Sequence, residues 1–326
     1  MSKNKSRIRR RRKRSLFRNL FFLILFVVMI VVGYGAYVAV EGYQASKKTY
    51  NELERGKQSA LRDKAVEISK DPFSILLMGV EDYSTGGEHG RTDTLILLTI
   101  DPQKETAKMV SIPRDTRVEI IGRDSMDKIN HAHAFGGPDM TINTVENFLD
   151  IPIDYYAKVN FEGFKGVINE IGGVKVDVPF DFWEYSDEVN RKKIQFTEGP
   201  MELDGEEALA YVRMRRFDSD FGRSDRQRQV INAALDKTLS VKNLFKLDEI
   251  ADHLSGNIET NLTATELFSL QKKFTKLNSS DIENLKFTGQ DARIDGVYYF
   301  EPNEENVAEI KQVLKTHLNH ENTSME

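Results

Sequence analysis

The chain has 326 residues, 40% hydrophobic and 30% charged, which allows one large domain or two small ones with a sizeable core. It contains no cysteine, which excludes disulfide bonds, thiolate metal sites and cysteine nucleophiles. The net charge of −5 is unevenly distributed. Residues 1–18 hold ten lysines and arginines and no acid, so the rest of the chain has 36 basic and 51 acidic residues.

Residues 20–40 form an uncharged apolar run that is long enough to cross a bilayer as a helix. Because the basic block precedes this run, the positive-inside rule predicts a cytoplasmic tail over residues 1–19 and an extracytoplasmic body. We therefore expect a single-pass type II anchor in the cell membrane; the alternative is a cleaved signal peptide, whose apolar core is normally shorter. A basic block in this position contacts anionic membrane lipid, and no nucleic-acid partner is expected.

Residues 41–70 are highly charged and lack the apolar content of a core, so we expect a partly helical stalk there. Asp71 and Pro72 break this segment. The sequence therefore predicts one extracytoplasmic domain over residues 71–320.

Strand and helix patterns alternate through this body. Short apolar or alternating runs predict strands at residues 73–80, 94–101, 108–112, 155–159 and 174–178. Spacing and end signals predict helices at residues 140–150, 161–171, 207–216, 230–239 and 303–318, more helices within 244–277, a loop over 126–140 and a hairpin over 285–300. Asp204 with Glu207, and Ser224 with Gln227, match the capping box that opens a helix. The fold class predicted is α/β, with a mixed central sheet flanked by helices.

Residues 211–229 concentrate positive charge in an otherwise acidic body. The stretch contains six arginines: Arg213, Arg215, Arg216, Arg223, Arg226 and Arg228. Because the arginine fork matches carboxylate and phosphate oxygens, the stretch could clamp a phosphorylated ligand. Asp218, Asp220 and Asp225 lie between the arginines, so a face held by salt bridges is the alternative.

Polar side chains also follow or precede three predicted strands. They are Glu81 and Asp82, Arg91 and Asp93, and Arg114 and Asp115. If these strands are neighbours, their loops converge at one edge of the sheet, where α/β proteins commonly bind ligands. Asp82 and Asp93, with water and phosphate oxygens, would suit Mg²⁺, and the alternative is loop capping or pairing with arginine.

A third polar group comprises Lys128, Asn130, His131 and His133. No third histidine or thiolate accompanies the two histidines, which favours structural or substrate-contacting roles over a metal site. The sequence has neither the serine hydrolase elbow nor the P-loop motif.

The motifs ILLMGVED, GRTDTLILLTID, MVSIPRDTRV, KINHAHAFGG and EALAYVRMRR with DFGRSDRQRQVI occur in this order over residues 70–240. In this arrangement the chain resembles the LytR-CpsA-Psr family, and within it the LytR/TagU-type teichoic acid transferases of Gram-positive bacteria. The resemblance implies a phosphotransferase that moves an anionic glycopolymer, such as wall teichoic acid, from an undecaprenyl-pyrophosphate carrier to peptidoglycan.

The resemblance also assigns site residues. Asp82 and Asp93 match the acidic, Mg²⁺-associated positions. The positions that match the pyrophosphate-binding arginines and their polar supports are Arg91, Arg114, Arg213, Arg215, Arg223, Lys128 and Gln227. We expect in-line transfer in which Asp82 or Asp93 accepts the proton of the acceptor hydroxyl and Arg114 stabilises the developing charge. Two rivals stay open: a polyprenyl-pyrophosphate hydrolase, and a non-catalytic regulator that senses envelope precursors.

Overall fold

The computed structural model describes residues 49–81, 90–187, 191–215, 220–238, 256–263, 265–267, 269–270 and 281–320. The predicted anchor at residues 20–40 lies outside these ranges. Within them, no helix is both long enough and apolar enough to span a bilayer. The architecture that follows is therefore that of the body.

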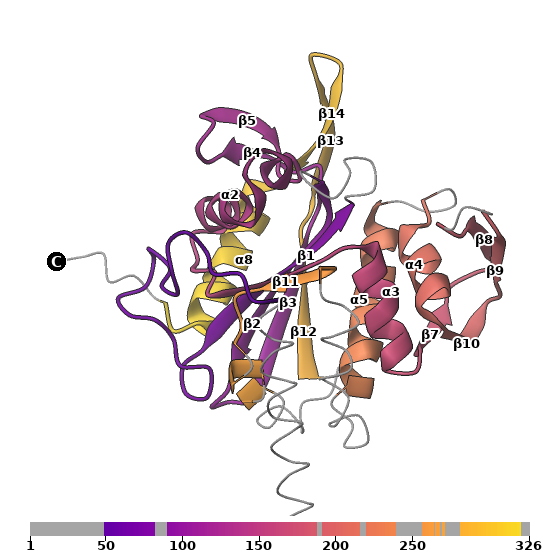
Figure 1. Cartoon of the computed structure of the whole chain (residues 1–326). Helices are drawn as coiled ribbons and strands as arrows, with labels where there is room; N and C mark the ends of the chain where they lie inside the picture. The colour runs from indigo at the N-terminus through magenta and orange to yellow at the C-terminus, as the bar shows by residue number, and fades with distance from the viewer. Residues whose placement is uncertain are drawn as a thin grey trace, which may run out of the picture.

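A six-stranded sheet lies at the centre of the body (Figure 1). Its strands, in spatial order, are β11 (Ile258–Thr260), β6 (Tyr155–Val159), β1 (Phe73–Glu81), β2 (Arg91–Asp101), β3 (Thr106–Ile112) and β12 (Ile282–Lys286). β2 pairs antiparallel with β1 and β3, whereas β6 runs parallel to β1 and β12 parallel to β3. The predicted mixed sheet is confirmed.

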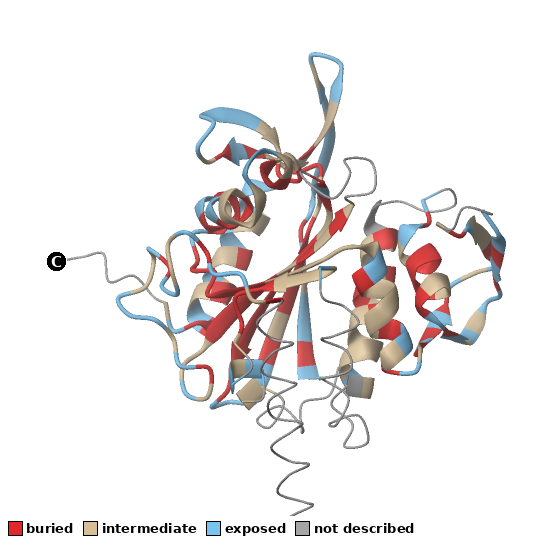
Figure 2. Ribbon diagram, in the orientation of Figure 1, coloured by how far each residue is buried: buried red, intermediate tan, exposed pale blue. Residues whose placement is uncertain are grey.

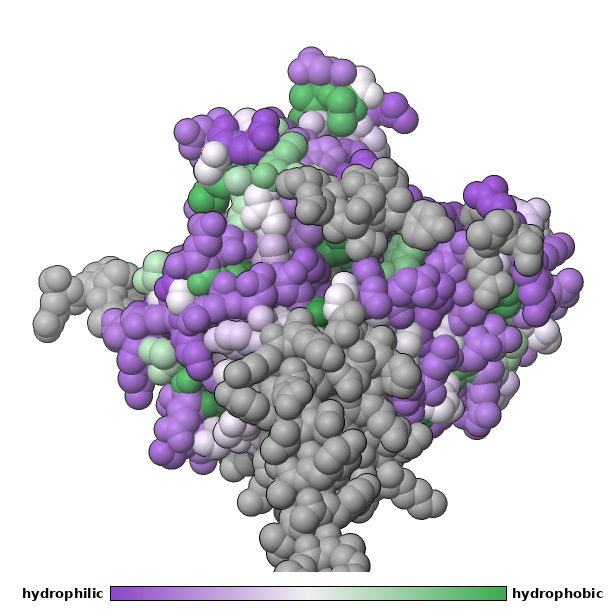
Figure 3. All heavy atoms as spheres, in the orientation of Figure 1, coloured by the Kyte–Doolittle hydropathy of each residue, from purple (hydrophilic) through white to green (hydrophobic). Residues whose placement is uncertain are grey.

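Helices cover both faces of this sheet, so its central strands are apolar on both sides (Figure 2). On one face, side chains such as Leu76 and Leu97 pack in one cluster with α2 (His131–Leu149) and α8 (Glu304–His317). On the other face, Ile96 and Met109 belong to a cluster that includes residues of α5 (Asp220–Thr238). The predicted central sheet flanked by helices is confirmed. On the face of the molecule that Figure 3 shows, the described surface is mainly hydrophilic, with small hydrophobic patches.

A third apolar cluster lies beside the sheet, at the right of Figure 1. Besides residues of α5, it contains two further helices and two small sheets: α3 (Phe161–Glu170), α4 (Gly205–Arg213), β7 (Val174–Val178) with β10 (Gly199–Leu203), and β8 (Phe182–Tyr185) with β9 (Lys193–Phe196). The rings of Phe182 and Phe196 stack at its centre with centroids 4.5 Å apart. This cluster fixes α4, the helix that leads into the arginine-rich stretch.

The predicted capping box at the start of α4 is confirmed. The Asp204 side chain accepts a hydrogen bond from the Glu207 amide (2.9 Å), and the Glu207 side chain accepts one from the Asp204 amide (3.1 Å). The second predicted box, at Ser224 and Gln227, is wrong because α5 already begins at Asp220 and Ser224 lies within the helix. The C-terminal half of the arginine-rich stretch is therefore helical.

The loop predicted over residues 126–140 is also wrong. Its first residues belong to β5 (Ser125–Lys128), which pairs with β4 (Arg117–Ile120), and the rest forms the first turns of α2. Gly136 and Gly137 have non-helical backbone angles (φ −150° and 61°) ahead of Pro138, so the helix kinks there and continues. A glycine pair followed by proline resembles a loop in sequence, although here it marks a kink.

The remaining helical prediction, within residues 244–277, lies mostly outside the described residues. Its described part includes β11, so Ile258–Thr260 is a strand and the prediction is wrong at those positions. The predicted hairpin is confirmed as β13 (Gly289–Ile294) and β14 (Val297–Pro302), which project from the body (Figure 1). Asp295 and Gly296 both have positive φ (51° and 82°), as a tight two-residue hairpin turn requires.

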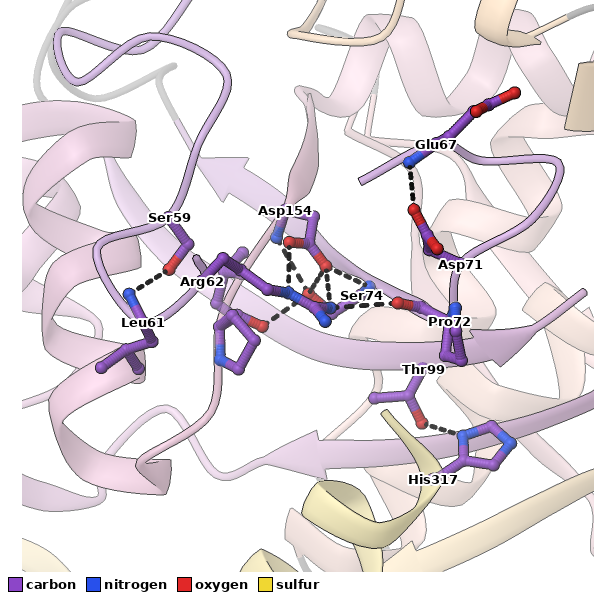
Figure 4. A network of polar contacts seen from close by, with 12 residues as sticks. Ser59, Leu61, Arg62, Glu67, Asp71, Pro72, Ser74, Thr99, Asp154 and His317 are labelled. Carbon is purple, nitrogen blue, oxygen red and sulfur yellow. Dashed lines mark hydrogen bonds and ion pairs between the residues drawn. The ribbon is translucent and has the colours of Figure 1, made fainter. Parts of the chain in front are cut away.

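Residues 49–72, which we call the strap, lie against the body, whereas the sequence predicted a stalk over residues 41–70. Leu53 and Ile68 are buried in the clusters on the two faces of the sheet. Arg62 forms a two-pronged ion pair with Asp154, with nitrogen–oxygen distances of 3.0 and 2.7 Å (Figure 4). Basic residues of the strap, which suggest a solvated segment in the sequence, are thus neutralised by acidic residues of the body. Apolar periodicity does not reveal this pairing.

The strap also reaches the outer strand of the sheet. Tyr50 forms a parallel bridge with Thr260 of β11, and the Asn51 amide donates to the Thr260 carbonyl at 2.8 Å. The hydroxyl of Tyr156 donates to the Asn51 carbonyl at 3.0 Å. The start of the strap is therefore joined to the sheet by backbone hydrogen bonds.

Candidate active site

The loops that carry the predicted site residues converge at one end of the sheet. β1 ends at Glu81, which pairs with Arg91 at the start of β2. β3 ends at Ile112, which pairs with Leu95 of β2. Because these neighbours are antiparallel, the end of β1, the start of β2 and the end of β3 share one edge, as expected. Asp82 lies outside the described residues.

A cavity of about 230 Å³ opens at this edge. It lies between the start of β2, the segment after β3, helix α5 and the projecting hairpin. Its polar lining consists of Asp93, Thr94, Ser111, Arg114, Asp115, Arg223, Ser224, Gln227, Asp291 and Tyr298. Four of the predicted site residues, Asp93, Arg114, Arg223 and Gln227, are therefore brought together around one cavity.

Arg114 is the hub of an ionic network in this cavity. Its Nη1 donates to Asp93 and its Nε donates to Asp115 at 3.3 Å. Lys128, at the end of β5, pairs with the other oxygen of Asp115 at 2.8 Å. Burial alone would raise the pKa of Asp115, but the hydrogen bond from Lys128 and the charge of Arg114 lower it overall. Asp115 thus stays ionised and holds both cations at the edge of the cavity.

Helix α5 presents Arg223 and Gln227 to the same cavity. The side chain of Arg223 is almost fully buried, at 6% exposed. The Gln227 amide donates to the Thr94 hydroxyl at 2.9 Å, which joins α5 to the start of β2. A guanidinium that is withdrawn from water interacts strongly with an anion, because little solvent screens it.

Two other arginines of α5 have structural contacts. Arg226 donates from Nε to the Tyr211 carbonyl (3.1 Å) and from Nη2 to the Met214 carbonyl (2.7 Å), which satisfies carbonyls at the end of α4. Arg228 pairs with Asp225 and approaches the Ser111 hydroxyl at 3.3 Å. The structure therefore divides the stretch: Arg223 lines the cavity, whereas Arg226 and Arg228 hold α5 against its neighbours.

Three predicted clamp residues do not line the cavity in the described part of the chain. Arg91, Arg213 and Arg215 are exposed and are not among the described residues that line the cavity. The guanidinium of Arg213, at the end of α4, lies 4.8 Å from the centre of the Phe161 ring. Their assignment to pyrophosphate binding stays a prediction.

The two histidines of the KINHAHAFGG motif have protein partners. His131 lies 2.9 Å from Asp127, and Nδ1 of the buried His133 lies 2.7 Å from the Gly90 carbonyl. No group of three or more acids or histidines in the described part of the chain is arranged to hold a metal. The sequence predicted structural or substrate-contacting roles for these histidines, and their contacts agree with the first of these roles.

The chemistry of the donors at the cavity nevertheless fits Mg²⁺. The Asp93 side chain is 34% exposed, and the Thr94 hydroxyl lines the same cavity. Carboxylate and hydroxyl oxygens are hard ligands, and Mg²⁺ normally completes its shell with water and phosphate oxygens.

Several cavity residues are not among those that the sequence predicts. Thr94 and Ser111 lie within the apolar runs of β2 and β3, whose pattern predicts only strands. Asp291 and Tyr298 come from the hairpin, more than 60 residues after the arginine-rich stretch. A polar residue inside an otherwise apolar strand was the available signal for the first pair, whereas the second pair had none.

Comparison with known proteins agrees with this geometry. The model of the LytR_cpsA_psr family matches residues 36–316, which is most of the chain. The chain belongs to this family. Among its relatives is the polyisoprenyl-teichoic acid–peptidoglycan teichoic acid transferase TagV of Bacillus subtilis, 47% identical over 313 residues that cover 94% of this chain and 80% of TagV.

Solved structures of the LytR_cpsA_psr family share the fold. The crystal structure of B. subtilis TagV superposes with a TM-score of 0.71 at 51% identity, covering 78% of this chain and 99% of that one. A structure of the family protein YwtF (TagT) with bound octaprenyl pyrophosphate lipid superposes with a TM-score of 0.66 at 37% identity, covering 83% and 100%.

Proposed function

We propose that this chain is a phosphotransferase that moves an anionic glycopolymer, wall teichoic acid, from an undecaprenyl-pyrophosphate carrier to peptidoglycan. The observation that carries this proposal is the cavity at the sheet edge, where Arg114 and the buried Arg223 lie among polar side chains. The names of the relatives and the octaprenyl pyrophosphate bound to TagT supply the substrate classes.

The cavity suits a pyrophosphate because its cations come from separate, fixed elements. Arg114 follows β3 and Arg223 lies on α5, while Lys128, at the end of β5, pairs with Asp115 of the lining. Asp93 and Asp115 hold Arg114 in place without a ligand. Guanidinium groups that are pre-oriented in this way stabilise charge on transferring phosphoryl groups without reorganising during the reaction.

The reaction would be an in-line displacement at the phosphorus that carries the sugar. The oxygen of a peptidoglycan hydroxyl forms the new bond to phosphorus, and the bond to the bridging pyrophosphate oxygen breaks, so undecaprenyl phosphate departs. Asp82 or Asp93 accepts the hydroxyl proton. Arg114 and Arg223 stabilise the charge on the phosphates. Cleavage of the pyrophosphate drives the reaction, so no nucleotide is needed.

Asp93, together with Asp82, would hold Mg²⁺ beside the phosphates. The ion would neutralise negative charge on the pyrophosphate. Support for this assignment is the accessible Asp93 carboxylate at the cavity and the preference of Mg²⁺ for such oxygens.

We also propose that residues 20–40 anchor the protein in the membrane with the body outside the cell. The apolar run and the basic block before it support this topology. Because the chain has no cysteine, single cysteines at Ser2 and at the exposed Lys64 can report it directly. A membrane-impermeant maleimide should label Lys64→Cys but not Ser2→Cys in intact cells, and the reverse pattern would reject the topology.

The transfer activity can be tested with purified lipid-linked polymer and peptidoglycan oligomers. Arg114→Ala should lower the transfer rate by about 10- to 100-fold, the value of one desolvated charge-assisted contact. Arg123→Ala is the matched control, because Arg123 is exposed and lies 3.8 Å from the Phe135 ring, outside the cavity lining. Equal rates for these two folded variants would refute the clamp.

The products of the same reaction separate the rival functions. A transferase yields a phosphodiester conjugate of polymer and peptidoglycan. A pyrophosphate hydrolase yields free phosphorylated polymer, and a sensor leaves the lipid-linked substrate intact.

A further inference from the structure

A second hollow, which we call the groove, lies beside the hairpin β13–β14. Its volume is about 870 Å³, within the range of about 300–1,000 Å³ that is usual for ligand sites. It is bounded by residues at the base of the hairpin, the start of α8 and Phe148 of α2. No predicted site residue lines it, and the transfer mechanism does not use it.

The hairpin forms a wall between the groove and the active-site cavity. Directly paired residues of an antiparallel hairpin point to the same face. The pair Asp291 and Phe300 lines the cavity, whereas the neighbouring pair Gln290 and Glu301 lines the groove. A ligand in the groove is therefore about one sheet layer, roughly 10 Å, from a phosphate in the cavity.

The lining of the groove combines apolar surface with neutral hydrogen-bonding groups. Phe148, Pro302 and Val307 provide the apolar surface, and Thr288 and Gln290 provide hydroxyl and amide groups. Arg117 also lines the groove, and its guanidinium lies 6.0 Å from the ring centre of Tyr299. Such a lining matches the two faces of a sugar chain, whose C–H surfaces pack on apolar groups while its hydroxyls bind amides.

The charges of the groove lining indicate which class of ligand the groove can bind. The charged residues of the lining are two basic and two acidic: Arg117, Lys311, Glu301 and Glu304. The cavity holds the buried Arg223, whereas the cations of the groove, Arg117 and Lys311, are only half-buried and are matched by an equal number of acids. The groove therefore offers no net attraction to an extended polyanion such as the donor polymer, or to an anionic lipid surface. We propose that the groove binds the acceptor as an uncharged, hydroxyl-bearing glycan strand and leads it to the cavity. This inference rests on the proposed transferase function.

Hydrogen bonds hold the groove and the active site in one rigid unit. The Asn303 amide donates to the Thr288 carbonyl at 2.7 Å, and the Thr288 amide donates to the Asn306 side chain at 2.8 Å, which joins the hairpin to α8. The Phe300 amide donates to the Asp115 carbonyl at 2.9 Å, which joins the hairpin to the segment that carries Arg114. A strand bound in the groove therefore has a fixed position relative to Arg114, as a site that orients an acceptor requires.

The test uses the full-length chain in lipid nanodiscs and two variants of adjacent exposed residues on α8. Ala308 lines the groove, so Ala308→Trp fills it, whereas Glu309 does not line it, so Glu309→Trp adds the same bulk outside. The probes are a β-1,4-linked oligomer of N-acetylated amino sugars and a soluble poly(glycerol phosphate), titrated by calorimetry. Transfer kinetics are then measured with varied acceptor and with varied lipid-linked donor.

Ala308→Trp should weaken binding of the sugar oligomer about 10-fold or more and raise the acceptor KM to match, with an unchanged donor KM. Glu309→Trp should bind as wild type does. The inference is overturned if the wild type does not bind the oligomer, or if Ala308→Trp leaves the acceptor KM unchanged. It is also overturned if Ala308→Trp abolishes binding of poly(glycerol phosphate) and not of the sugar oligomer. The wild type could also bind the oligomer but show no transfer activity, with Ala308→Trp abolishing that binding. This result would reject the proposed transferase function and retain the glycan-binding site.

Discussion

Replacement of Arg62 by alanine removes one of the two buried ionic links that the described residues make between the strap and the body, the other being Arg55 with Glu146. Arg62 contacts both oxygens of Asp154, and its Nη2 also donates to the Pro72 carbonyl at 3.1 Å (Figure 4). The Asp154 side chain is only 2% exposed, so its carboxylate is not solvated by water. After the substitution, Asp154 keeps the Ser74 amide as a donor at 3.0 Å, while the Ser74 hydroxyl, 3.3 Å away, donates its hydrogen to the Pro152 carbonyl at 2.7 Å.

The expected cost follows from this geometry. Removal of one partner of a buried ion pair typically costs about 3–5 kcal/mol, because the other charge stays buried without compensation. Since the Ser74 amide still donates a hydrogen bond to the carboxylate, we expect the lower end, about 3 kcal/mol in the free energy of unfolding. For a domain of this size, that loss corresponds to a fall in Tm of about 6–12 °C.

Urea and thermal unfolding, followed by circular dichroism, measure this loss. Lys70→Ala is the matched control, because Lys70 pairs with Glu67 where both side chains are more than half exposed, and no measurable change is expected. The double variant Arg62→Met/Asp154→Asn should be more stable than Arg62→Met, since it leaves no buried charge. A loss for Arg62→Ala that equals the control would refute the reasoning.

Two further predictions concern His317 and Asp93. His317 is buried with its ring nitrogens 2.8 and 3.0 Å from the hydroxyls of Thr99 and Thr106, and burial lowers its pKa to about 4. The unfolded state, with a pKa near 6.5, therefore takes up a proton first as pH falls, and stability is lost between about pH 6.5 and 4. Between pH 7 and 4.5, the free energy of unfolding of the wild type, measured by urea titration, should fall by about 2.5 kcal/mol more than that of His317→Gln. Equal falls for the two proteins would contradict this prediction. Asp93→Asn should raise the Mg²⁺ concentration for half-maximal transfer about 10-fold or more, whereas Asp124→Asn, on an exposed turn, should not. Identical Mg²⁺ titrations for Asp93→Asn and wild type would exclude Asp93 as a ligand.

The main elements of the fold could be predicted because their sequence signals are local. The apolar runs of β1 and β2 and the capping box at Asp204 specify structure within a few residues. The start of α5 could not be predicted in this way, because Ser224 and Gln227 match a capping signature inside a helix that is held by tertiary contacts of Arg226 and Arg228. A local signature marks a helix start only where nothing upstream continues the helix.

The candidate site was predictable where residues flank strands. Asp93 and Arg114 were found because they lie at the ends of neighbouring strands, and the structure joins them in one ion pair. The contributions of Tyr298 and Asp291 were not predictable, since they depend on where the hairpin lies relative to β3. The different environments of Arg223 and Arg213 also require tertiary structure, because burial of the first and exposure of the second have no local sequence signal.

The bridge between Tyr50 and Thr260 has a consequence for self-association. An open sheet can recruit strands from other copies through unpaired backbone groups at its two outermost strands. At β11 the strap already occupies such groups, through the Asn51 amide and the Thr260 carbonyl. At β12, the opposite margin, exposed Glu283 and Lys286 place charge along the strand. Both edge strands of the sheet thus discourage pairing with strands of other copies, which favours a protein that does not aggregate at high local concentration.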